Sequence, residues 1–209
     1  IWNVFNRFGI GQATGTGFPG ESSGLLPNRP RWHATEKVSL AFGYGITTTP
    51  LQLAHAYSVF ANGGVQQPIS LLAVEEEQVP GVQVISPEVA AQVLQVLHAV
   101  TGEHGTARKA KVPGYKVGGK TGTVHKVGPG GYIDDKYIAL FAGIAPVEDP
   151  RLVTVVVINE PKGEDYGGGA AAAPVFSSVT KGSLRILNVL PSELEAIAEA
   201  AEQERGGAA

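Results

Sequence analysis

The sequence predicts a mixed α/β fold in which an antiparallel sheet is flanked by helices, and three observations support this prediction. Two capped helical patterns precede residue 115, three short strand patterns follow it, and a further helical pattern comes after the strands. Consecutive strands with short connections pair in antiparallel fashion, and helices before and after such a run are typical of this fold class. The chain of 209 residues is long enough to bury a sizeable core.

The composition excludes several classes of function. A hydrophobic fraction of 43% argues against a disordered chain. A net charge of −3 argues against a broad basic surface, so we expect no nucleic-acid partner. The absence of cysteine excludes disulfides and thiolate catalysis. The histidines, at positions 33, 55, 98, 104 and 125, lack the spacings of a metal site, and we expect neither a metal nor a cofactor.

The first residues have the pattern of the last turns of a helix. Ile1, Val4, Phe5 and Phe8 share one helical face, and Gly9 is typical of a helix end. The chain contains no methionine, no signal peptide and no apolar run near the roughly 18 residues of a membrane span. We therefore expect it to be an internal piece of a longer protein.

Two further helices are predicted before the strands. The first begins with Thr49 as N-cap, Pro50 at the first helical position and Gln52 completing a capping box, and it ends at residues 62–64. The second begins at residues 86–88 and ends at Gly102. Its predicted apolar stripe consists of Val89, Val93, Leu94, Leu97 and Val100.

The three strands are predicted over residues 115–127, 137–145 and 152–158, as an antiparallel meander with a turn at the sequence GPGG of residues 128–131. A glycine-rich loop follows, and then a helix is predicted over residues 174–189. The residues expected to face inward on this helix are Val175, Phe176, Val179, Leu184 and Leu187.

We expect residues 1–190 to form one domain and residues 191–209 to form an acidic tail. The tail carries five glutamates against one arginine, a net charge of −4. Ser192 and Glu195 form a second capping-box pattern, but the apolar residues that follow are too few to hold a helix by packing. The tail is therefore predicted to fray.

Two motifs compete for Lys120. Residues 114–121 match the phosphate-binding pattern G-x-x-x-x-G-K-[ST], which requires a helix directly after the lysine. The residues that follow are glycine, β-branched residues and proline, which make a helix costly. The residues before Gly114 are polar and basic instead of forming a buried strand. A P-loop nucleoside triphosphatase is therefore kept as a remote alternative.

The second interpretation places Lys120, Thr121, Gly122 and Thr123 on a strand. Alternation then puts Lys120 and Gly122 on one face and both threonines on the other. At the edge of a sheet this segment would offer a cation, two hydroxyls and unpaired amides, and Gly122 would let another backbone approach closely. These groups suit a peptide that ends in a carboxylate and docks like an added strand.

The motif Lys-Thr-Gly is one of the signatures of penicillin-binding proteins and serine β-lactamases. Further segments recur in the order which that family shows: TGTGFPGE at 14–21, AFGYGI at 41–46, TPLQLA at 49–54, KTGT at 120–123, KYIA at 136–139, FAGIAP at 141–146, VVVINEP at 155–161, YGG at 166–168 and APVF at 173–176. The chain resembles the C-terminal half of the transpeptidase domain of class B penicillin-binding proteins, especially the division-specific (septal) enzymes of Gram-negative bacteria. The resemblance covers nearly all of residues 1–190.

The resemblance implies a peptidoglycan D,D-transpeptidase that acts through a serine acyl-enzyme. The family's nucleophile motif S-x-x-K and its second motif S-x-N both precede Lys-Thr-Gly. This chain has no Ser-x-Asn, and its one Ser-x-x-Lys, at residues 178–181, follows the third motif inside a predicted helix. We interpret that match as chance and expect the nucleophile upstream of this chain.

By the same resemblance, Lys120 belongs to the hydrogen-bond network around the serine of the second motif. Thr121 and Thr123 would bind the terminal carboxylate of the substrate, with Gly122 between them. The backbone N–H of Thr123 would supply half of the oxyanion hole, so Lys120 and Thr123 are the catalytic candidates.

Six other positions are candidate substrate-binding residues by this resemblance. Tyr44, Tyr137 and Tyr166 match aromatic residues that line the family's cleft. His125 stands where relatives often carry Arg or Lys. Gly167 and Gly168 belong to the YGG segment, and Gly167 occupies a position where some relatives carry an aromatic residue.

The implied partners are a peptidoglycan stem peptide ending in D-Ala-D-Ala, β-lactam inhibitors, and the preceding half of the same domain. Divisome membrane proteins, including a glycan polymerase, are also implied, with a periplasmic location and an inner-membrane anchor upstream of this chain. A non-catalytic β-lactam-sensing or interaction domain of the same fold is the alternative, which the presence or absence of the upstream S-x-x-K would decide.

Overall fold

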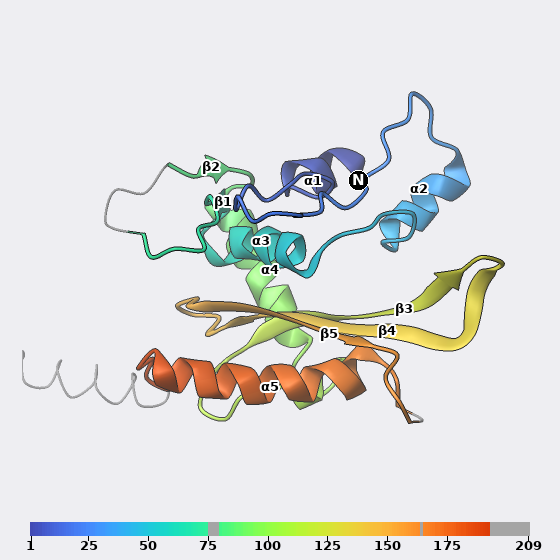
Figure 1. Ribbon diagram of the computed structural model, residues 1–209. Coiled ribbons are helices and arrows are strands. Elements are labelled where there is room, and N and C mark those ends of the chain that lie inside the picture. Colours follow the sequence, from blue (N-terminus) through green and yellow to red (C-terminus); the bar gives the residue numbers. More distant parts are fainter. Residues whose placement is uncertain (75–79, 164, 193–209) are drawn as a thin grey trace, which may run out of the picture. The chain divides into compact units, whose positions relative to one another are not determined.

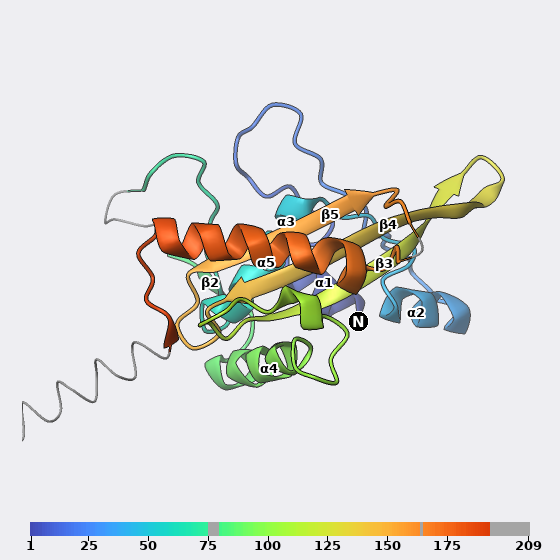
Figure 2. The same cartoon turned by 90° about the horizontal axis from the view of Figure 1, so that it is seen from below.

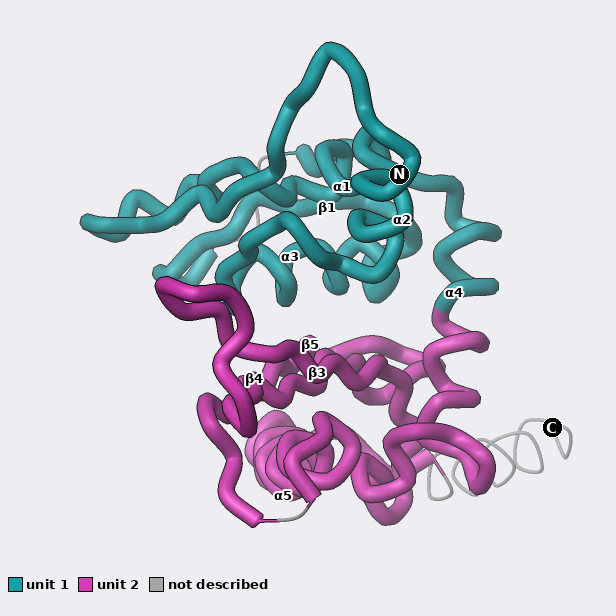
Figure 3. Tube along the Cα trace, turned by 90° about the vertical axis from the view of Figure 1, so that its right-hand side faces the viewer, with its two compact units in different colours: residues 1–93 teal, residues 94–209 magenta. Residues whose placement is uncertain are grey.

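A computed structural model describes residues 1–74, 80–163 and 165–192. The chain forms two compact units, Ile1–Val93 and Leu94–Ala209 (Figure 3). The predicted acidic tail from residue 193 onward lies outside the described residues, and so does the helix that the Ser192 capping box would begin.

The first unit is built mainly from short helices. It contains α1 (Trp2–Arg7), α2 (Ala34–Ala41), α3 (Pro50–Ala61) and the antiparallel pair β1 (Val65–Gln66) and β2 (Val82–Gln83) (Figure 1). The boundary between the units falls within α4 (Pro87–Ala99), as the colours in Figure 3 show. The predicted helix end at the start of the chain is confirmed, because Gly9 takes a φ of 82° directly after the C-cap Phe8. The core cluster of the first unit consists of Phe8, Ile10, Ala56, Val59 and Val84.

The capping box at the start of α3 is confirmed. The Thr49 hydroxyl accepts from the Gln52 N–H at 3.0 Å, and Gln52 Oε1 accepts from the Thr49 N–H at 2.8 Å. Gln52 is 1% exposed, and its Nε2 also donates to the carbonyl oxygens of Gln12 and Ser23 at 2.6 and 2.7 Å. One buried amide therefore caps a helix and fixes the glycine-rich loop that precedes it.

The predicted stripe of α4 is only partly correct. Leu97 is buried, but Val89 is 43% exposed. Ala90, which is fully buried, takes the inward position in the first turn. A small residue makes this close contact, and a pattern that counts only large side chains does not detect it.

The second unit contains the predicted antiparallel meander. β3 (Gly118–Gly128) pairs with β4 (Gly131–Ala145), and β4 pairs with β5 (Leu152–Asn159), in the order β3-β4-β5. β4 begins six residues before its predicted start, because Gly128 pairs with Gly131 around a two-residue turn. Residues 131–136 are exposed, so they carry no alternation of apolar and polar residues by which the strand could have been recognised.

Helix α5 (Gly168–Ile186) covers one face of this sheet (Figures 1 and 2). Phe176 of the helix meets Phe141 of β4 with ring centroids 4.8 Å apart, and both are fully buried. The short 3-10 helix η1 (Arg108–Ala110) also packs against α5. The core cluster consists of Ala107, Ala110, Val112, Val117, Phe141, Ala145, Ala172, Ala173, Phe176 and Leu184.

Two predictions for α5 are wrong. The helix begins at Gly168 and not at Pro174, which lies inside it. Val175, Val179 and Leu187 are 40%, 48% and 49% exposed, although they were expected to face inward. The buried face of α5 follows the helical spacing of Ala173, Phe176, Thr180 and Leu184. Two of these four residues, Ala173 and Thr180, are small, so large apolar side chains alone do not mark this face.

The early start of α5 depends on Gly168. This residue is buried, and a Cβ atom there would collide with the carbonyl oxygen of Leu140 and lie 2.6 Å from that of Gly122. The helix end therefore rests directly on the backbone of two paired strands. The glycines of this segment act as helix residues that permit close contact, which a loop prediction does not anticipate.

We expect Gly168→Ala to lower the free energy of unfolding by about 1–3 kcal/mol, because the added methyl group must push the helix off the sheet. Gly182→Ala is the matched control in the same helix, since a Cβ there has nothing within 4 Å. It should stabilise the protein by about 0.5–1 kcal/mol through helix propensity. Denaturant titration of both variants checks the pair, and equal effects would contradict the packing argument.

Candidate active site

The candidate site is the edge of the sheet formed by β3. Among the residues that the structure describes, β3 pairs with β4 and with no strand on its other side. Lys120 lies within this strand and residues 121–128 continue it, so no helix follows the lysine. The P-loop alternative is therefore wrong.

The backbone of β3 alternates between its partner strand and its open edge. Lys120 Nζ donates to the carbonyl oxygen of Thr121 at 2.9 Å, so this carbonyl points away from β4. In an antiparallel pair every second residue has both its N–H and its C=O on the same side. The N–H and C=O of Thr123 therefore also face the open edge, while those of Gly122 face Leu140, its partner in the register.

The two threonine side chains share one face of β3, as predicted, and this is the face that α5 covers. Thr123 Oγ1 accepts from the backbone N–H of Gly168 at 3.0 Å, at the first residue of the helix. Thr121 Oγ1 lies 3.2 Å from Thr106 Oγ1 and accepts from Lys120 Nζ at 3.3 Å. The ammonium group thus reaches round the strand to the hydroxyl of its neighbour, and Lys120 and Thr123 are both exposed.

Close packing requires two of the three candidate glycines, Gly122 and Gly168, but not Gly167. A Cβ at Gly122 would lie 2.8 Å from Leu140 Cγ, on the face opposite α5. Gly168 is buried beneath the backbone of β3 and β4, as described above. Gly167 is the N-cap of α5, and a Cβ there would meet Thr123 Oγ1 at 3.8 Å, an ordinary contact distance.

An aromatic cluster lies at the far end of the KTGT segment. His125 and Tyr137 are partners in the register, with ring centroids 4.4 Å apart, and Tyr137 stacks on Tyr166 at 3.8 Å and 13°. Tyr132 also meets His125, edge on, at 5.8 Å. A hydrogen bond with the Tyr166 side chain raises the pKa of the Tyr137 phenol. The structure therefore brings three candidates together as one partly exposed stack that starts two residues beyond Thr123.

Tyr44 belongs to the other unit. It lies in the turn after α2 and lines a hollow of about 170 Å³ together with Trp32 and Leu40. The structure describes it as part of that unit's surface, and its role at the site stays a prediction.

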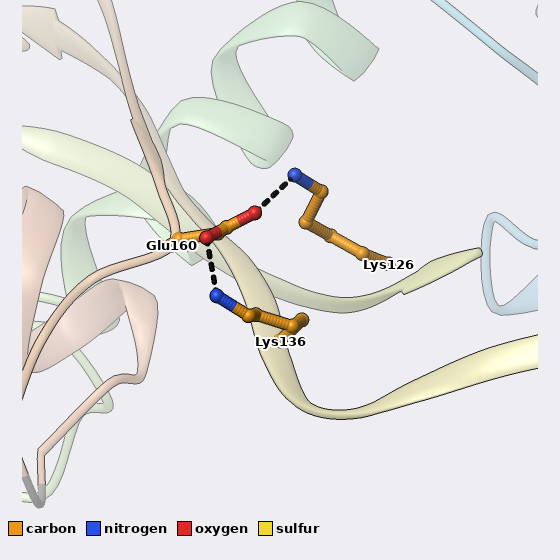
Figure 4. Close-up of polar contacts among 3 residues, drawn as sticks. All are labelled: Lys126, Lys136 and Glu160. Carbon is orange, nitrogen blue, oxygen red and sulfur yellow. Dashed lines mark hydrogen bonds and ion pairs between the residues drawn. The ribbon is translucent and has the colours of Figure 1, made fainter. Parts of the chain in front are cut away.

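Sequence reasoning did not detect Glu160, which bridges two strands of the site (Figure 4). Its carboxylate binds Lys126 Nζ and Lys136 Nζ at 2.6 Å each, and its backbone N–H donates to the Tyr137 carbonyl at 2.9 Å. The two lysines follow His125 and precede Tyr137, so this ion bridge lies beside the aromatic stack. Hydrogen bonds from Lys126 and then Lys136 lower the pKa of Glu160 to about 2.

A β-bulge explains why this cluster was missed. The register of β3 against β4 shifts between His125 and Val127, where residues 133–136 of β4 have no register partner, so β4 carries the extra residues and the one β3 residue opposite them is Lys126. Strict alternation predicts neither the direction of this side chain nor its partner. The sequence offered one indication of the ion bridge: Glu160 follows an apolar strand, and a lysine stands beside each of the candidates His125 and Tyr137.

Neither a metal cluster nor a membrane-spanning helix is present in the parts of the chain that the structure describes. No group of three or more His, Cys, Asp or Glu side chains is placed to hold a metal ion. No described helix is long and apolar enough to cross a membrane.

Comparison with known proteins identifies the family. Residues 1–181 match the model of the penicillin binding protein transpeptidase domain. The chain belongs to the penicillin-binding protein transpeptidase family. The resemblance seen in its motifs is therefore confirmed, and so is the fold class.

Relatives at moderate identity show how much of a transpeptidase this chain covers. It is 42% identical to the peptidoglycan D,D-transpeptidase FtsI of Escherichia coli K12 over 92% of the chain and 32% of that protein. It is 39% identical to the probable peptidoglycan D,D-transpeptidase PenA of Neisseria flavescens over 92% of the chain and 48% of that protein. The transpeptidase domain of Burkholderia pseudomallei penicillin-binding protein 3 has the same fold, with a TM-score of 0.85 and 39% identity over 91% of this chain and 58% of that one.

Glu160 gives this transpeptidase segment a defined acid dependence. Because folding lowers its pKa to about 2 from an ordinary 4.5, the carboxylate stabilises the fold above pH 4.5, and this contribution is lost as the pH falls toward 2. We expect the difference in thermal midpoint between wild type and Glu160→Gln to be present at pH 6 and to shrink steadily between pH 5 and 2. A difference that is constant over this range, or a carboxyl carbon that titrates near 4.5 by NMR, would contradict the ion bridge.

Proposed function

We propose that this chain forms the side of a D,D-transpeptidase site that binds the substrate's carboxylate, in a protein that cross-links peptidoglycan stem peptides during septal cell-wall synthesis. The serine nucleophile lies outside residues 1–209. Its Oγ attacks the carbonyl of the penultimate D-Ala, the terminal D-Ala leaves as a free amine, and an amine of a neighbouring stem peptide then displaces the serine from the ester. β-Lactams acylate the same serine.

The single observation that carries this proposal is the open edge of β3 with its lysine and two threonines. A peptide laid along that edge finds outward-facing backbone groups at Thr121 and Thr123. Thr123 Oγ1 already accepts from Gly168 N–H, which leaves its own proton free to donate to a carboxylate. Lys120 adds a positive charge beside that carboxylate and beside the nucleophile's proton network.

The outward N–H of Thr123 is the candidate oxyanion donor. An N–H held in a strand has a fixed direction, so it needs no reorganisation when the carbonyl oxygen gains negative charge. Loss of one such donor costs on the order of 10²–10³ in rate where a side-chain donor was removed. The fixed direction of this N–H supports Thr123 as a catalytic residue beside Lys120. Gly122, which lies between them, has no side chain to collide with Leu140 on the neighbouring strand.

The remaining parts of the proposal concern the whole protein. The stack of His125, Tyr137 and Tyr166 lines the substrate cleft beyond the carboxylate site. The partners are the preceding half of the same domain and divisome membrane proteins that include a glycan polymerase. The location is periplasmic, with an inner-membrane anchor upstream. The name of the E. coli relative, peptidoglycan D,D-transpeptidase FtsI, supports the septal role, and the other assignments follow from the motifs shared with class B penicillin-binding proteins.

Labelling of the full-length protein with a fluorescent penicillin tests the proposal. Wild type should form a covalent adduct, and Lys120→Ala should slow acylation by about 10–100-fold, the worth of one charge-assisted hydrogen bond. Lys181→Ala, an exposed lysine of α5, is the matched control and should acylate at the wild-type rate. A wild type that stays unlabelled at saturating reagent would overturn the enzyme assignment in favour of a non-catalytic domain.

The position of the adduct provides a second prediction. Peptide mapping of the labelled full-length protein should find the acylated serine outside residues 1–209, because Ser178 and Lys181 are exposed on α5 and do not belong to the helix face that packs against the sheet. An adduct on Ser178 would show that the Ser-x-x-Lys match in this chain is functional.

A further inference from the structure

Thr106 ends a chain of three polar groups that begins at Lys120. Lys120 Nζ donates to Thr121 Oγ1 at 3.3 Å, and Thr121 Oγ1 lies 3.2 Å from Thr106 Oγ1. Thr106 is not part of the KTGT motif and precedes it by 14 residues in the loop after α4. The structure thus places a further hydroxyl beside Thr121, one of the two threonines of the proposed site.

The loop around Thr106 is held in place by its neighbours. Ala107 is fully buried and its N–H donates to the Val100 carbonyl at 3.0 Å. A Cβ at Gly105 would collide with that same carbonyl, and a Cβ at Gly169 of α5 would collide with the carbonyl of Thr106. The backbone on both sides of Thr106 is therefore fixed, while Thr106 itself is exposed and its hydroxyl lies against that of Thr121.

The donors and acceptors of Thr121 restrict what its hydroxyl can do. A threonine hydroxyl has one proton to donate and two lone pairs to accept with. The lysine ammonium can only donate, so it occupies one lone pair of Thr121 Oγ1. If Thr106 donates to the second lone pair, the proton of Thr121 is free for a ligand, whereas if Thr106 accepts, that proton is used.

A substrate carboxylate decides between these two arrangements. A carboxylate only accepts, and hydrogen bonds to charged groups contribute about 1.5–3 kcal/mol against about 1 for neutral pairs. The proton of Thr121 therefore turns toward the carboxylate, and Thr106 takes the donor role.

We propose that Thr106 is a positioning residue of the transpeptidase site, which donates to Thr121 Oγ1 and thereby directs the Thr121 proton toward the substrate's carboxylate. This inference rests on the proposed function, because it concerns how Thr121 binds that carboxylate. Thr106 acts through Thr121 and touches no reacting atom.

The test compares acylation of the full-length protein by benzylpenicillin and by its methyl ester, which lacks the negative charge. Thr106→Val removes the hydroxyl at nearly constant shape and should slow acylation by benzylpenicillin about three- to tenfold, the worth of one neutral hydrogen bond. Acylation by the ester should change less than twofold. Thr106→Ser keeps the hydroxyl and should restore the wild-type rate, and Thr154→Val on β5, at the opposite edge of the sheet, should leave both rates unchanged.

A double-mutant cycle separates action through Thr121 from independent binding. If Thr106 acts through Thr121, Thr106→Val adds nothing further once Thr121→Val is present. Additive effects, an equal loss with both ligands, or no loss with benzylpenicillin would each overturn the inference while the proposed function stands. A wild type that benzylpenicillin does not acylate overturns the proposed function, and this inference with it.

Discussion

The site depends on the direct contact between the first residue of α5 and the backbone of β3 and β4. With no side chain at Gly168, the helix end rests on the paired residues Gly122 and Leu140. The backbone N–H of Gly168 donates a hydrogen bond to the hydroxyl of Thr123 and fixes its position. The neighbouring Gly169 leaves room for the carbonyl of Thr106, which brings a third hydroxyl to Thr121. One close contact between helix and sheet thus orients polar groups from three separate segments, because tightly packed interiors transmit small displacements.

The other end of the KTGT strand is held by charge in place of close packing. The carboxylate of Glu160 joins two lysines that flank the stacked rings, and its backbone N–H binds the Tyr137 carbonyl. These groups are partly exposed, so salt screens them more than it would a buried pair. One end of the KTGT strand is therefore held by close packing at Gly168, and the other by an ion bridge that weakens as the salt concentration rises.

Local sequence patterns predicted the main helices and strands. The start of α5 and the partners of Thr106 and Glu160 depend on contacts between residues far apart in the sequence. The capping box of α3, the three strands and the alternation of Thr121 and Thr123 were all predictable, because each depends on residues near in sequence. The start of α5 was not, since glycine is disfavoured in helices and its benefit here comes from the strands beneath it. Thr106 and Glu160 were missed because their partners are 15 and 24–34 residues away.

The contact of Lys120 with the carbonyl of Thr121 has a consequence for the protein without its substrate. An open strand edge is a template for unwanted pairing with another chain, and charged side chains, lysine above all, are a common protection against it. Here the ammonium covers an edge carbonyl that an invading strand would need. Under the proposed function, the substrate peptide brings its own carboxylate and can draw the ammonium away, whereas an uncharged aggregating segment cannot. The same lysine can therefore protect the edge from self-association and admit the intended ligand.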